Sequence, residues 1–228
     1  MELSKNIVKM KKNRKALIFD MGGVIVDLDI EGCKNAFKSF LGYHKIDEII
    51  DPCHQKGIYG DLEEGTLSAE DFRSIVLSES IPGSDPADVD RAMSYILNRI
   101  APYKADLLRR LSADYDLYLL SNNNPISMKH ADVLFRNAVI PLEEIFIKNF
   151  LSFQVKALKP SEKFYKTVIE EVGLPSDQML FIDDSQRNVD GANAAGLPAI
   201  YYKPGTDLSA LIAEALSDPT LKMEDVCR

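Results

Sequence analysis

The chain has 228 residues, of which 46% are hydrophobic and 27% are charged, a balance that is typical of a soluble globular protein. This length allows one large domain or one domain that carries an insertion. The net charge of −8 argues against a nucleic-acid partner, because nucleic-acid-binding surfaces are basic.

The cysteines and the apolar runs indicate the cellular location to expect. The three cysteines lie far apart in the sequence and form neither a disulfide framework nor a zinc motif. Residues 1–14 are rich in lysine, lack the apolar core of a signal peptide and are expected to form a flexible tail. No run approaches the roughly 18 apolar residues of a membrane span. We therefore expect a cytoplasmic protein with no membrane partner.

The first predicted strand covers residues 16–19, a short apolar run that ends at Asp20. Gly22 and Gly23 follow, and they allow the backbone to turn tightly. Such a run is typical of a buried parallel strand, and the carboxyl ends of parallel strands face the crevice where ligands bind. Taken alone, Asp20 would more simply cap the turn. Residues 24–26 predict a small flap over the strand end rather than a core element.

Residues 30–99 show helical patterns throughout. We expect helices over 35–41 and 46–59, a loop at 61–65, and helices from 69 to about 80 and from 86 to about 99. Ser68 is the expected N-cap of the third helix, because Asp71 follows at capping-box spacing. No strand pattern interrupts this segment, so it predicts a separate helical cap domain.

From residue 100 onward, short apolar runs alternate with helical patterns. The predicted strands are 116–120, 145–150, 178–182 and 198–202. The predicted helices are 103–113, 125–137, 161–172, 188–195 and 207–216. This alternation predicts an α/β fold with a doubly wound, Rossmann-like parallel sheet. The core domain would then consist of residues 15–29 and 100–228.

Three of the predicted strands end on polar clusters. Asp20 ends the first, Ser121 and Asn122 end the second, and Asp183 and Asp184 end the strand at 178–182. In a parallel sheet these ends lie on one edge. A basic residue, Lys159, lies in a loop of the same half of the chain. Together these residues predict a functional site, although any one of them alone would not.

The chemistry of this set favours a metal and a phosphate. Three crowded carboxylates, Asp20, Asp183 and Asp184, repel one another unless a proton or a cation intervenes, and Mg²⁺ suits carboxylates and water. Ser121 and Asn122 are the candidates for binding a substrate phosphate, since a hydroxyl and backbone N–H groups are good phosphate ligands. Lys159 would neutralise the phosphoryl oxygens, and Asp20 is the candidate nucleophile for an acyl-phosphate intermediate.

At these positions the chain resembles the haloacid dehalogenase superfamily, in particular its phosphatases with a helical cap inserted after the first strand. Its four motifs correspond to Asp20-Met-Gly-Gly-Val24, to Ser121, to Lys159-Pro160 and to Asp183-Asp184, in the order that the family uses. The resemblance extends from about residue 15 to residue 216. It implies a Mg²⁺-dependent phosphatase acting on a small phosphorylated metabolite.

The resemblance also implies roles for individual metal ligands. In the family, Mg²⁺ is held by the first aspartate, here Asp20, and by the backbone carbonyl two residues later, here Gly22. The fourth motif completes the site, with Asp184 at the position that usually ligates directly. Asp183 then orients a metal-bound water.

One position departs from the family pattern. The second aspartate of the first motif protonates the leaving alcohol and activates the hydrolytic water, and here that position is Gly22. Loss of a general acid/base costs about 10²–10⁴-fold in rate. A similar phosphatase subgroup with Asp-Leu-Gly-Asn/Gly-Val at this point includes enzymes that act on glucose 1-phosphate, and residues 60–72 resemble its cap loop. A sugar phosphate with a good leaving group would depend less on the missing acid.

Other titratable residues are weaker candidates. Asp27 and Asp29 could replace the missing acid, although charged residues of a flap are usually only solvated. His54 in the cap could reach the cleft, although a surface position is the simpler interpretation. Asn188 either bonds to the metal-site loop or caps the following helix.

Several functions compete with the phosphatase. A haloacid dehalogenase also lacks the second aspartate, but it needs no Mg²⁺ and lacks the acidic pair, which is retained here at Asp183 and Asp184. A non-catalytic phosphate-binding pseudoenzyme would explain Gly22 by lost activity. A phosphomutase is disfavoured, because it depends on the missing acid. The sequence leaves the substrate open and allows a monomer or a homodimer.

Overall fold

The computed structural model describes residues 16–50 and 57–222. Five parallel strands form the central sheet in the order β5-β4-β1-β6-β7, so that β1 lies in the middle. The five strands are β1 (Ala16–Phe19), β4 (Asp116–Ser121), β5 (Lys148–Leu151), β6 (Met179–Asp183) and β7 (Ala199–Tyr201). The predicted doubly wound α/β fold is confirmed.

Strand β1 is apolar on both of its faces, as a central parallel strand requires. Ala16 and Ile18 point to one face and Leu17 and Phe19 to the other, since side chains alternate along a strand. All four side chains are fully buried. Burial of a Leu, Ile or Phe side chain contributes about 1.5–3 kcal/mol, so this short run stabilises the centre of the sheet.

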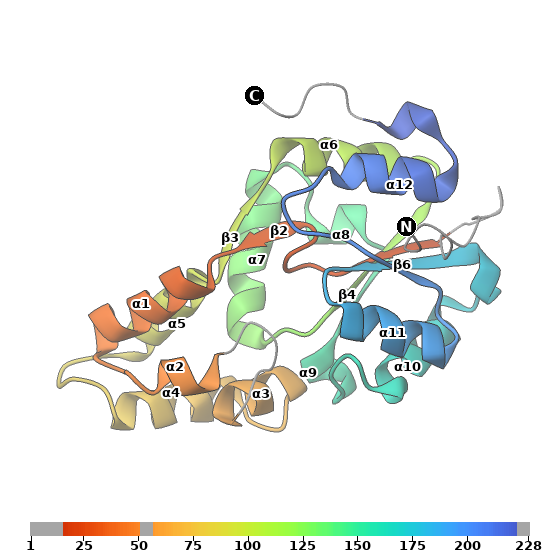
Figure 1. Ribbon diagram of the computed structural model, residues 1–228. Coiled ribbons are helices and arrows are strands. Elements are labelled where there is room, and N and C mark those ends of the chain that lie inside the picture. The colour runs from red at the N-terminus through yellow and green to blue at the C-terminus, as the bar shows by residue number, and fades with distance from the viewer. Residues whose placement is uncertain (1–15, 51–56, 223–228) are drawn as a thin grey trace, which may run out of the picture.

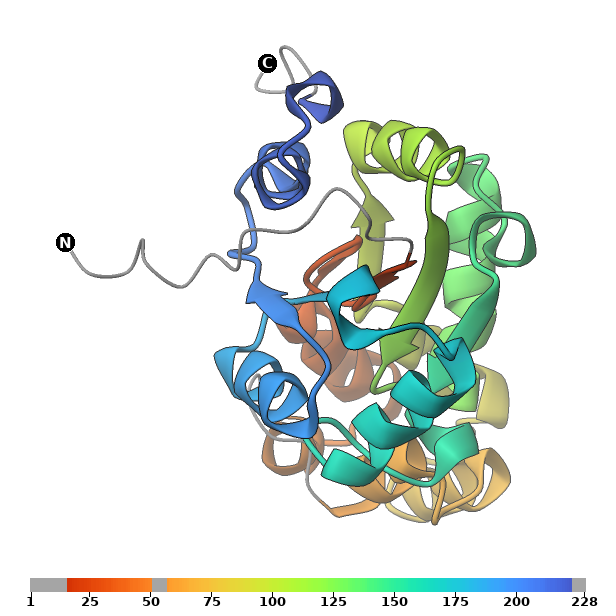
Figure 2. The same cartoon turned by 90° about the vertical axis from the view of Figure 1, so that its right-hand side faces the viewer.

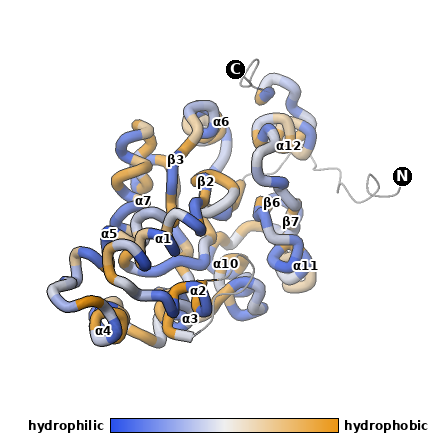
Figure 3. Tube along the Cα trace, turned by 60° about the vertical axis from the view of Figure 1, so that its left-hand side comes forward, coloured by the Kyte–Doolittle hydropathy of each residue, from blue (hydrophilic) through white to orange (hydrophobic). Residues whose placement is uncertain are grey.

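Helices cover both faces of the sheet (Figure 1, and from the side in Figure 2). One hydrophobic cluster joins Leu17 and Phe19 to α6 (Pro102–Leu111), α7 (Pro125–Asn137) and α12 (Leu208–Leu216). A second cluster joins Ala16 and Ile18 to α10 (Glu162–Val172) and α11 (Gln186–Ala195). Hydrophilic and hydrophobic residues alternate along these helices (Figure 3), as expected for helices with one buried face.

The remaining short elements of the core connect these layers. They are α8 (Leu142–Ile145), α9 (Ser152–Val155) and the 3₁₀ turns at Ser176–Gln178 and Pro219–Leu221. No helix in the described part of the chain is long and apolar enough to cross a membrane.

A helical segment lies between two short strands that leave the core. Strands β2 (Val26–Leu28) and β3 (Leu97–Ile100) pair antiparallel and form a two-stranded ribbon. Between them lie α1 (Ile30–Leu41), α2 (Ile46–Ile49), α3 (Gly57–Glu64), α4 (Ala69–Ser78) and α5 (Pro86–Ser94). These five helices gather at one end of the molecule, at the lower left of Figure 1.

Capping residues define the ends of these helices. Ser68 Oγ accepts a hydrogen bond from the N–H of Asp71, which confirms the predicted N-cap of α4. Asp29 caps α1 by accepting from the N–H of Gly32, and α1 ends where Gly42 adopts the left-handed conformation.

Several local predictions were wrong. The helix expected over residues 46–59 ends at Ile49, where Ile50 adopts an extended conformation, and the strand expected over 145–150 begins only at Lys148. Residues 97–99 were expected to be helical, but they form strand β3, because a short apolar run fits either structure until it finds a pairing partner. Residues 61–64 were expected in a loop, but they complete α3. Residues 24–26 were expected to form a small hairpin or flap outside the core, but Val24, Ile25 and Val26 are fully buried members of the hydrophobic core.

Candidate active site

Two adjacent strands bring the acidic residues together. Phe19 at the end of β1 is in register with Ile182 of β6, so Asp20 comes next to Asp183 and Asp184. The N–H of Asp20 donates to the carbonyl of Ile182 over 2.9 Å and continues the sheet by one residue. One carboxylate oxygen from each of the three aspartates lies within 4.8 Å of the others.

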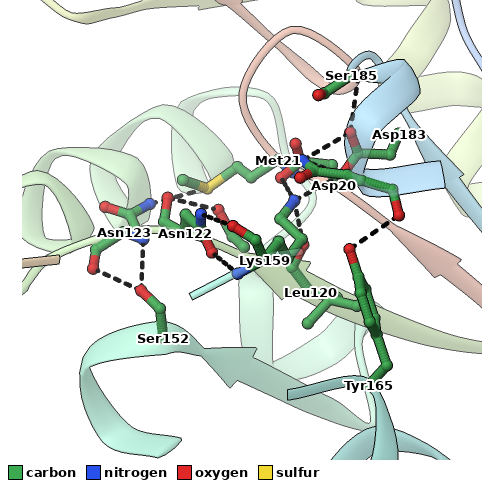
Figure 4. Close-up of polar contacts among 12 residues, drawn as sticks. Asp20, Met21, Leu120, Asn122, Asn123, Ser152, Lys159, Tyr165, Asp183 and Ser185 are labelled. Atoms are coloured by element: carbon green, nitrogen blue, oxygen red, sulfur yellow. Dashed lines mark hydrogen bonds and ion pairs between the residues drawn. The ribbon is translucent and has the colours of Figure 1, made fainter. Parts of the chain in front are cut away.

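Lys159 lies at the centre of this group (Figure 4). Its ammonium nitrogen is 2.9 Å from Oδ1 of Asp20 and 2.7 Å from Oδ2 of Asp183. It also donates to the carbonyl of Leu120 over 3.2 Å, so each of its three protons has an acceptor. Burial alone lowers the pKa of Lys159, but the carboxylates of Asp183 and Asp20 outweigh it and hold the pKa above its usual range. Lys159 is therefore charged.

One lysine does not balance three carboxylates. Burial raises the pKa of Asp20 well above its usual range, Lys159 opposes this shift, and Asp183 and Asp184 add to it. Burial and the charge of Asp183 raise the pKa of Asp184 to about 6. Both shifts come first from burial and then from the neighbouring carboxylates, and a bound cation would favour the charged forms. The chemistry of the donor set thus fits Mg²⁺.

Asp183 and Asp184, the acidic pair at the end of β6, differ in exposure. Asp183 is fully buried, and its oxygens accept hydrogen bonds from Ser185 N at 2.8 Å and from Asn188 Nδ2 at 3.0 and 3.2 Å, in addition to Lys159. Asp184 instead lines an open cleft. The arrangement therefore leaves the Asp184 carboxylate available to a ligand, whereas Asp183 is engaged with the protein. The hydrogen bond predicted between Asn188 and the metal-site loop is confirmed.

Gly23 makes room for the Asp184 carboxylate. A Cβ atom at Gly23 would lie 2.0 Å from Oδ2 of Asp184, which is far inside a van der Waals contact. Gly23 also has φ +77°, a conformation that L-residues rarely adopt. Both observations require glycine here, and they show that the first turn after β1 is shaped around Asp184.

Ser121 and Asn122 end strand β4 next to this cluster, and both line the cleft. The side chain of Asn122 bonds twice to the backbone of Lys159: it accepts from its N–H over 2.8 Å and donates to its carbonyl over 3.1 Å. The Asn122 amide thus positions Lys159. A contact from Asn122 to a phosphate would therefore come from its backbone N–H.

The cleft has a volume of about 960 Å³ and lies between the sheet edge and the helical segment. Asp20, Gly22, Ser121, Lys159 and Asp184 line its floor, so the structure brings the predicted site residues together, with Asp183 directly behind.

Comparison with known proteins identifies the family. The model of the haloacid dehalogenase-like hydrolases matches residues 14–196. The chain belongs to this family. The predicted superfamily is therefore confirmed, and the matched residues include Asp20, Lys159 and Asp183.

Three known proteins resemble this chain to different degrees in sequence and in structure. A D-ribitol-5-phosphate phosphatase from Bacteroides thetaiotaomicron is 32% identical over 194 residues, which are 85% of this chain and 94% of that protein. A HAD family enzyme from the same organism, solved as an aspartate-to-alanine variant with magnesium and inorganic phosphate, has a TM-score of 0.82 at 32% identity and covers 87% of this chain and 98% of its own. An L-2-haloacid dehalogenase from Xanthobacter autotrophicus has a TM-score of 0.58 at 21% identity over 91% of this chain and 86% of its own, which shows a common fold alone.

Two residues of α3 also line the cleft of this hydrolase, and the sequence analysis missed both. Glu63 and Tyr59 are buried, and the Tyr59 hydroxyl is hydrogen-bonded to the carboxyl group of Glu63. Burial raises the pKa of Glu63 to about 8, although Lys159 and Tyr59 oppose the shift. The only sequence signal was the likeness of residues 60–72 to a cap loop, because a Glu-Glu pair is otherwise typical of a solvated helix face.

The residues considered as substitutes for the missing acid have other partners. Asp27 forms ion pairs with Arg99 and with the buried Lys104, at 3.2 and 3.1 Å. Asp29 caps α1, and neither aspartate lines the cleft. The side chain of Leu28 lies over Gly22 instead. His54 lies outside the described residues.

Proposed function

We propose that this protein is a Mg²⁺-dependent phosphatase that hydrolyses a phosphorylated sugar or sugar alcohol through a covalent intermediate on Asp20. The observation that carries the proposal is the position of Lys159, which is within 2.9 Å of both Asp20 and Asp183, next to the cleft-lining Asp184. A buried nucleophile, a fixed cation and an uncompensated acidic group suit the transfer of a phosphoryl group.

The residues that would hold the metal are Asp20, Asp184 and the carbonyl of Gly22, all of which line the cleft. Asp183, which is bonded to Lys159, Ser185 and Asn188, would orient a water of the metal rather than bind the metal directly. When bound, Mg²⁺ supplies charge that offsets the carboxylates and the phosphoryl oxygens. A relative has been solved in complex with magnesium and inorganic phosphate, which supports Mg²⁺ as the cofactor.

The protein's own groups account for the first chemical step. A carboxylate oxygen of Asp20 forms a bond to phosphorus, and the bond from phosphorus to the substrate oxygen breaks, so that the dephosphorylated alcohol leaves. Lys159, which is paired with Asp20 and Asp183, stabilises the negative charge of the phosphoryl group. The hydroxyl of Ser121 and the backbone N–H groups that follow it bind the phosphoryl oxygens. Water then attacks phosphorus, releases phosphate and regenerates the Asp20 carboxylate.

We further propose that residues 30–99 act as a cap that closes over the substrate, with the β2–β3 ribbon as the connection to the core. A closed cap excludes water from the site, which strengthens every electrostatic contact within it. The cytoplasmic location and the choice between monomer and homodimer stay predictions.

The substrate class follows from the relative that acts on D-ribitol 5-phosphate. The cleft suits such a molecule, because polar residues such as Asn123, Gln186 and Arg187 line it together with apolar ones such as Leu28 and Ile96. Polyhydroxylated substrates need polar contacts for each hydroxyl and an apolar face for their carbon chain. Glucose 1-phosphate, suggested by the likeness of residues 60–72, is the alternative within the same class.

A phosphate-release screen tests this proposal. The panel contains pentitol and hexitol phosphates, glucose 1-phosphate, nucleotides and 4-nitrophenyl phosphate, each with Mg²⁺ and with EDTA. We expect release only with Mg²⁺, and fastest release from a phosphorylated sugar or sugar alcohol. Undiminished turnover in EDTA would refute the metal assignment.

The same screen separates the alternatives. Chloride release from 2-chloropropionate without Mg²⁺ would indicate a dehalogenase, which the acidic cluster disfavours. Binding of inorganic phosphate with no turnover of any substrate would indicate the pseudoenzyme that Gly22 suggests.

A further inference from the structure

The cleft lacks the acid that the family motif would place at position 22. Gly22 offers no proton, and a Cβ atom there would lie 3.1 Å from Cδ2 of Leu28, whose side chain covers the position. Asp27 and Asp29 are engaged in ion pairs and in a helix cap. An alkoxide leaving group nevertheless needs a proton, because alcohols are very weak acids. The proton must come from elsewhere in the cleft.

Most other titratable groups of the cleft are already committed. Asp20 is the nucleophile, Asp184 is a metal ligand, and all three protons of Lys159 are donated to acceptors in the protein. Tyr59 is a poor proton donor, because burial raises the pKa of its hydroxyl well above the usual range. Glu63 is the carboxyl group that remains in the described part of the cleft.

We propose that Glu63 is the proton-transferring residue of this enzyme and replaces the aspartate that the family carries at the position of Gly22. This inference rests on the proposed phosphatase function. Glu63 reaches the cleft from α3, whereas Asp20 reaches it from β1. Because attacking and leaving oxygens lie in line on phosphorus, the leaving oxygen points away from Asp20 and toward the helical cap.

Bonds from the core hold Glu63 in position. Ser152 of α9 donates to the backbone carbonyl of Glu63 over 2.6 Å, and the ammonium of Lys156 donates to the carbonyl of Gly65 just beyond it. The Glu63 carboxyl is bonded to Tyr59, whose hydroxyl is in turn bonded to Ser127 of α7. A group that transfers a proton needs such fixed geometry, since small displacements cost large factors in rate.

The protonation state of Glu63 also suits an acid. Burial raises its pKa to about 8, so Glu63 carries a proton at neutral pH. A carboxyl group near the working pH can both release and recover a proton during a catalytic cycle.

The proton of Glu63 is used in the first of two chemical steps and recovered in the second. In the first, Asp20 forms a bond to phosphorus, the bond from phosphorus to the substrate oxygen breaks, and Glu63 gives its proton to that oxygen to form the alcohol. In the second, the Glu63 carboxylate takes a proton from the attacking water, the bond from phosphorus to Asp20 breaks, and hydrogen phosphate leaves. Asp20 is again a carboxylate and Glu63 again carries a proton.

The test is the Glu63→Gln variant, which keeps the size of the side chain and removes the transferable proton. We expect kcat/KM for the alkyl phosphate that wild type hydrolyses fastest to fall about 10²–10⁴-fold. With 4-nitrophenyl phosphate, whose leaving group needs no proton, we expect a burst of one nitrophenolate per active site followed by slow turnover. The burst also counts folded sites. Glu64→Gln, the same change one residue further along and outside the cleft lining, should match wild type.

Other outcomes would overturn the assignment. Alkyl turnover of Glu63→Gln within a factor of three of wild type would do so, as would equal loss of both substrates without a burst in a variant that melts like wild type. Glu63→Asp is the second variant, and its recovered carboxyl should restore alkyl turnover relative to Glu63→Gln. Failure of the phosphatase function itself looks different, because wild type would then show no burst and no more turnover than Asp20→Asn.

Discussion

The ammonium of Lys159 lies 2.9 Å from Oδ1 of Asp20 in a site where both side chains are almost fully buried. Burial disfavours the carboxylate form of Asp20, and Lys159 is the group that opposes this effect. A nucleophilic carboxylate must be ionised, so this ion pair favours the reactive form of Asp20, and a bound cation would favour it further.

Lys159→Met removes this charge and leaves the buried carboxylates of Asp20 and Asp183 without a cation. We expect a loss of phosphate release and a decrease of about 3–5 kcal/mol in the free energy of unfolding without Mg²⁺, since a broken buried pair leaves charge uncompensated. Activity assays and urea unfolding in EDTA measure both effects. Lys166→Met, at an exposed lysine of α10, is the control and should change neither. A Lys159→Met protein as active as wild type would contradict this role.

Gly23→Ala tests the assignment of Asp184 to the metal. The new Cβ would lie 2.0 Å from Oδ2 of Asp184 and displace that carboxylate, so the Mg²⁺ concentration for half-maximal activity should rise by at least tenfold. Gly205→Ala is a matched control, because Gly205 has φ +82° and no atom within 4 Å of its added Cβ. Both variants carry the strain of a left-handed alanine, about 1 kcal/mol, but only Gly23→Ala should change the Mg²⁺ titration. Identical titrations for the two variants would argue against Asp184 as a ligand.

Gly22→Asp introduces the acid that the family motif carries. Its Cβ would meet the flexible end of Leu28, which is partly exposed and can move. In the Glu63→Gln background we expect this change to recover alkyl-phosphate turnover at least tenfold, because it supplies a second source of the proton. Gly22→Asn in the same background has the same size but cannot transfer a proton. Equal recovery by the asparagine would show that the effect is steric.

The buried carboxyl of Glu63 makes stability depend on pH. Its pKa is raised from an ordinary value near 4.5 to about 8 in the folded protein. Between these two pH values the folded protein holds a proton on Glu63 that the unfolded chain releases. The contribution of Glu63 to the free energy of unfolding is therefore fully present below pH 4.5 and is lost as the pH rises to about 8. A shift of this size corresponds to roughly 5 kcal/mol.

Glu63→Gln removes this dependence, because glutamine does not titrate. We expect the melting temperature of the variant, relative to wild type, to increase from pH 5 to pH 8 and then to level off, measured by circular dichroism in EDTA. Glu64→Gln supplies the baseline. A difference between Glu63→Gln and wild type that is the same at every pH would mean that Glu63 is not held protonated by the fold.

The sheet and the floor of the site could be predicted from the sequence because they depend on local patterns. Apolar runs that end on Asp20, Ser121 and Asp183 specify both the strands and the polar residues that follow them. Parallel strands then bring these ends to one edge, so their proximity follows from topology alone. The loop position of Lys159 does not show where its side chain points. Its place between the two aspartates is evident only from the three acceptors around its ammonium group in the structure.

The parts that could not be predicted depend on tertiary contacts. Residues 97–100 become a strand only because Val26–Leu28 offers a partner, and their apolar run fits a helix equally well. Glu63 has the sequence context of a solvated residue, and its burial follows from the packing of α3 on α9. A residue such as Glu63 is therefore found from the folded cleft rather than from a motif.

The measurement that tests the central claim most directly is phosphate release by wild type and by Asp20→Asn. The asparagine keeps the size of the side chain but removes its charge and its nucleophilic oxygen. With the best phosphorylated sugar or sugar alcohol of the panel and Mg²⁺, wild type should release phosphate, and Asp20→Asn should fall to the rate of wild type in EDTA. Equal, Mg²⁺-dependent release by wild type and Asp20→Asn would contradict the account, because the reaction would then proceed without the Asp20 carboxylate.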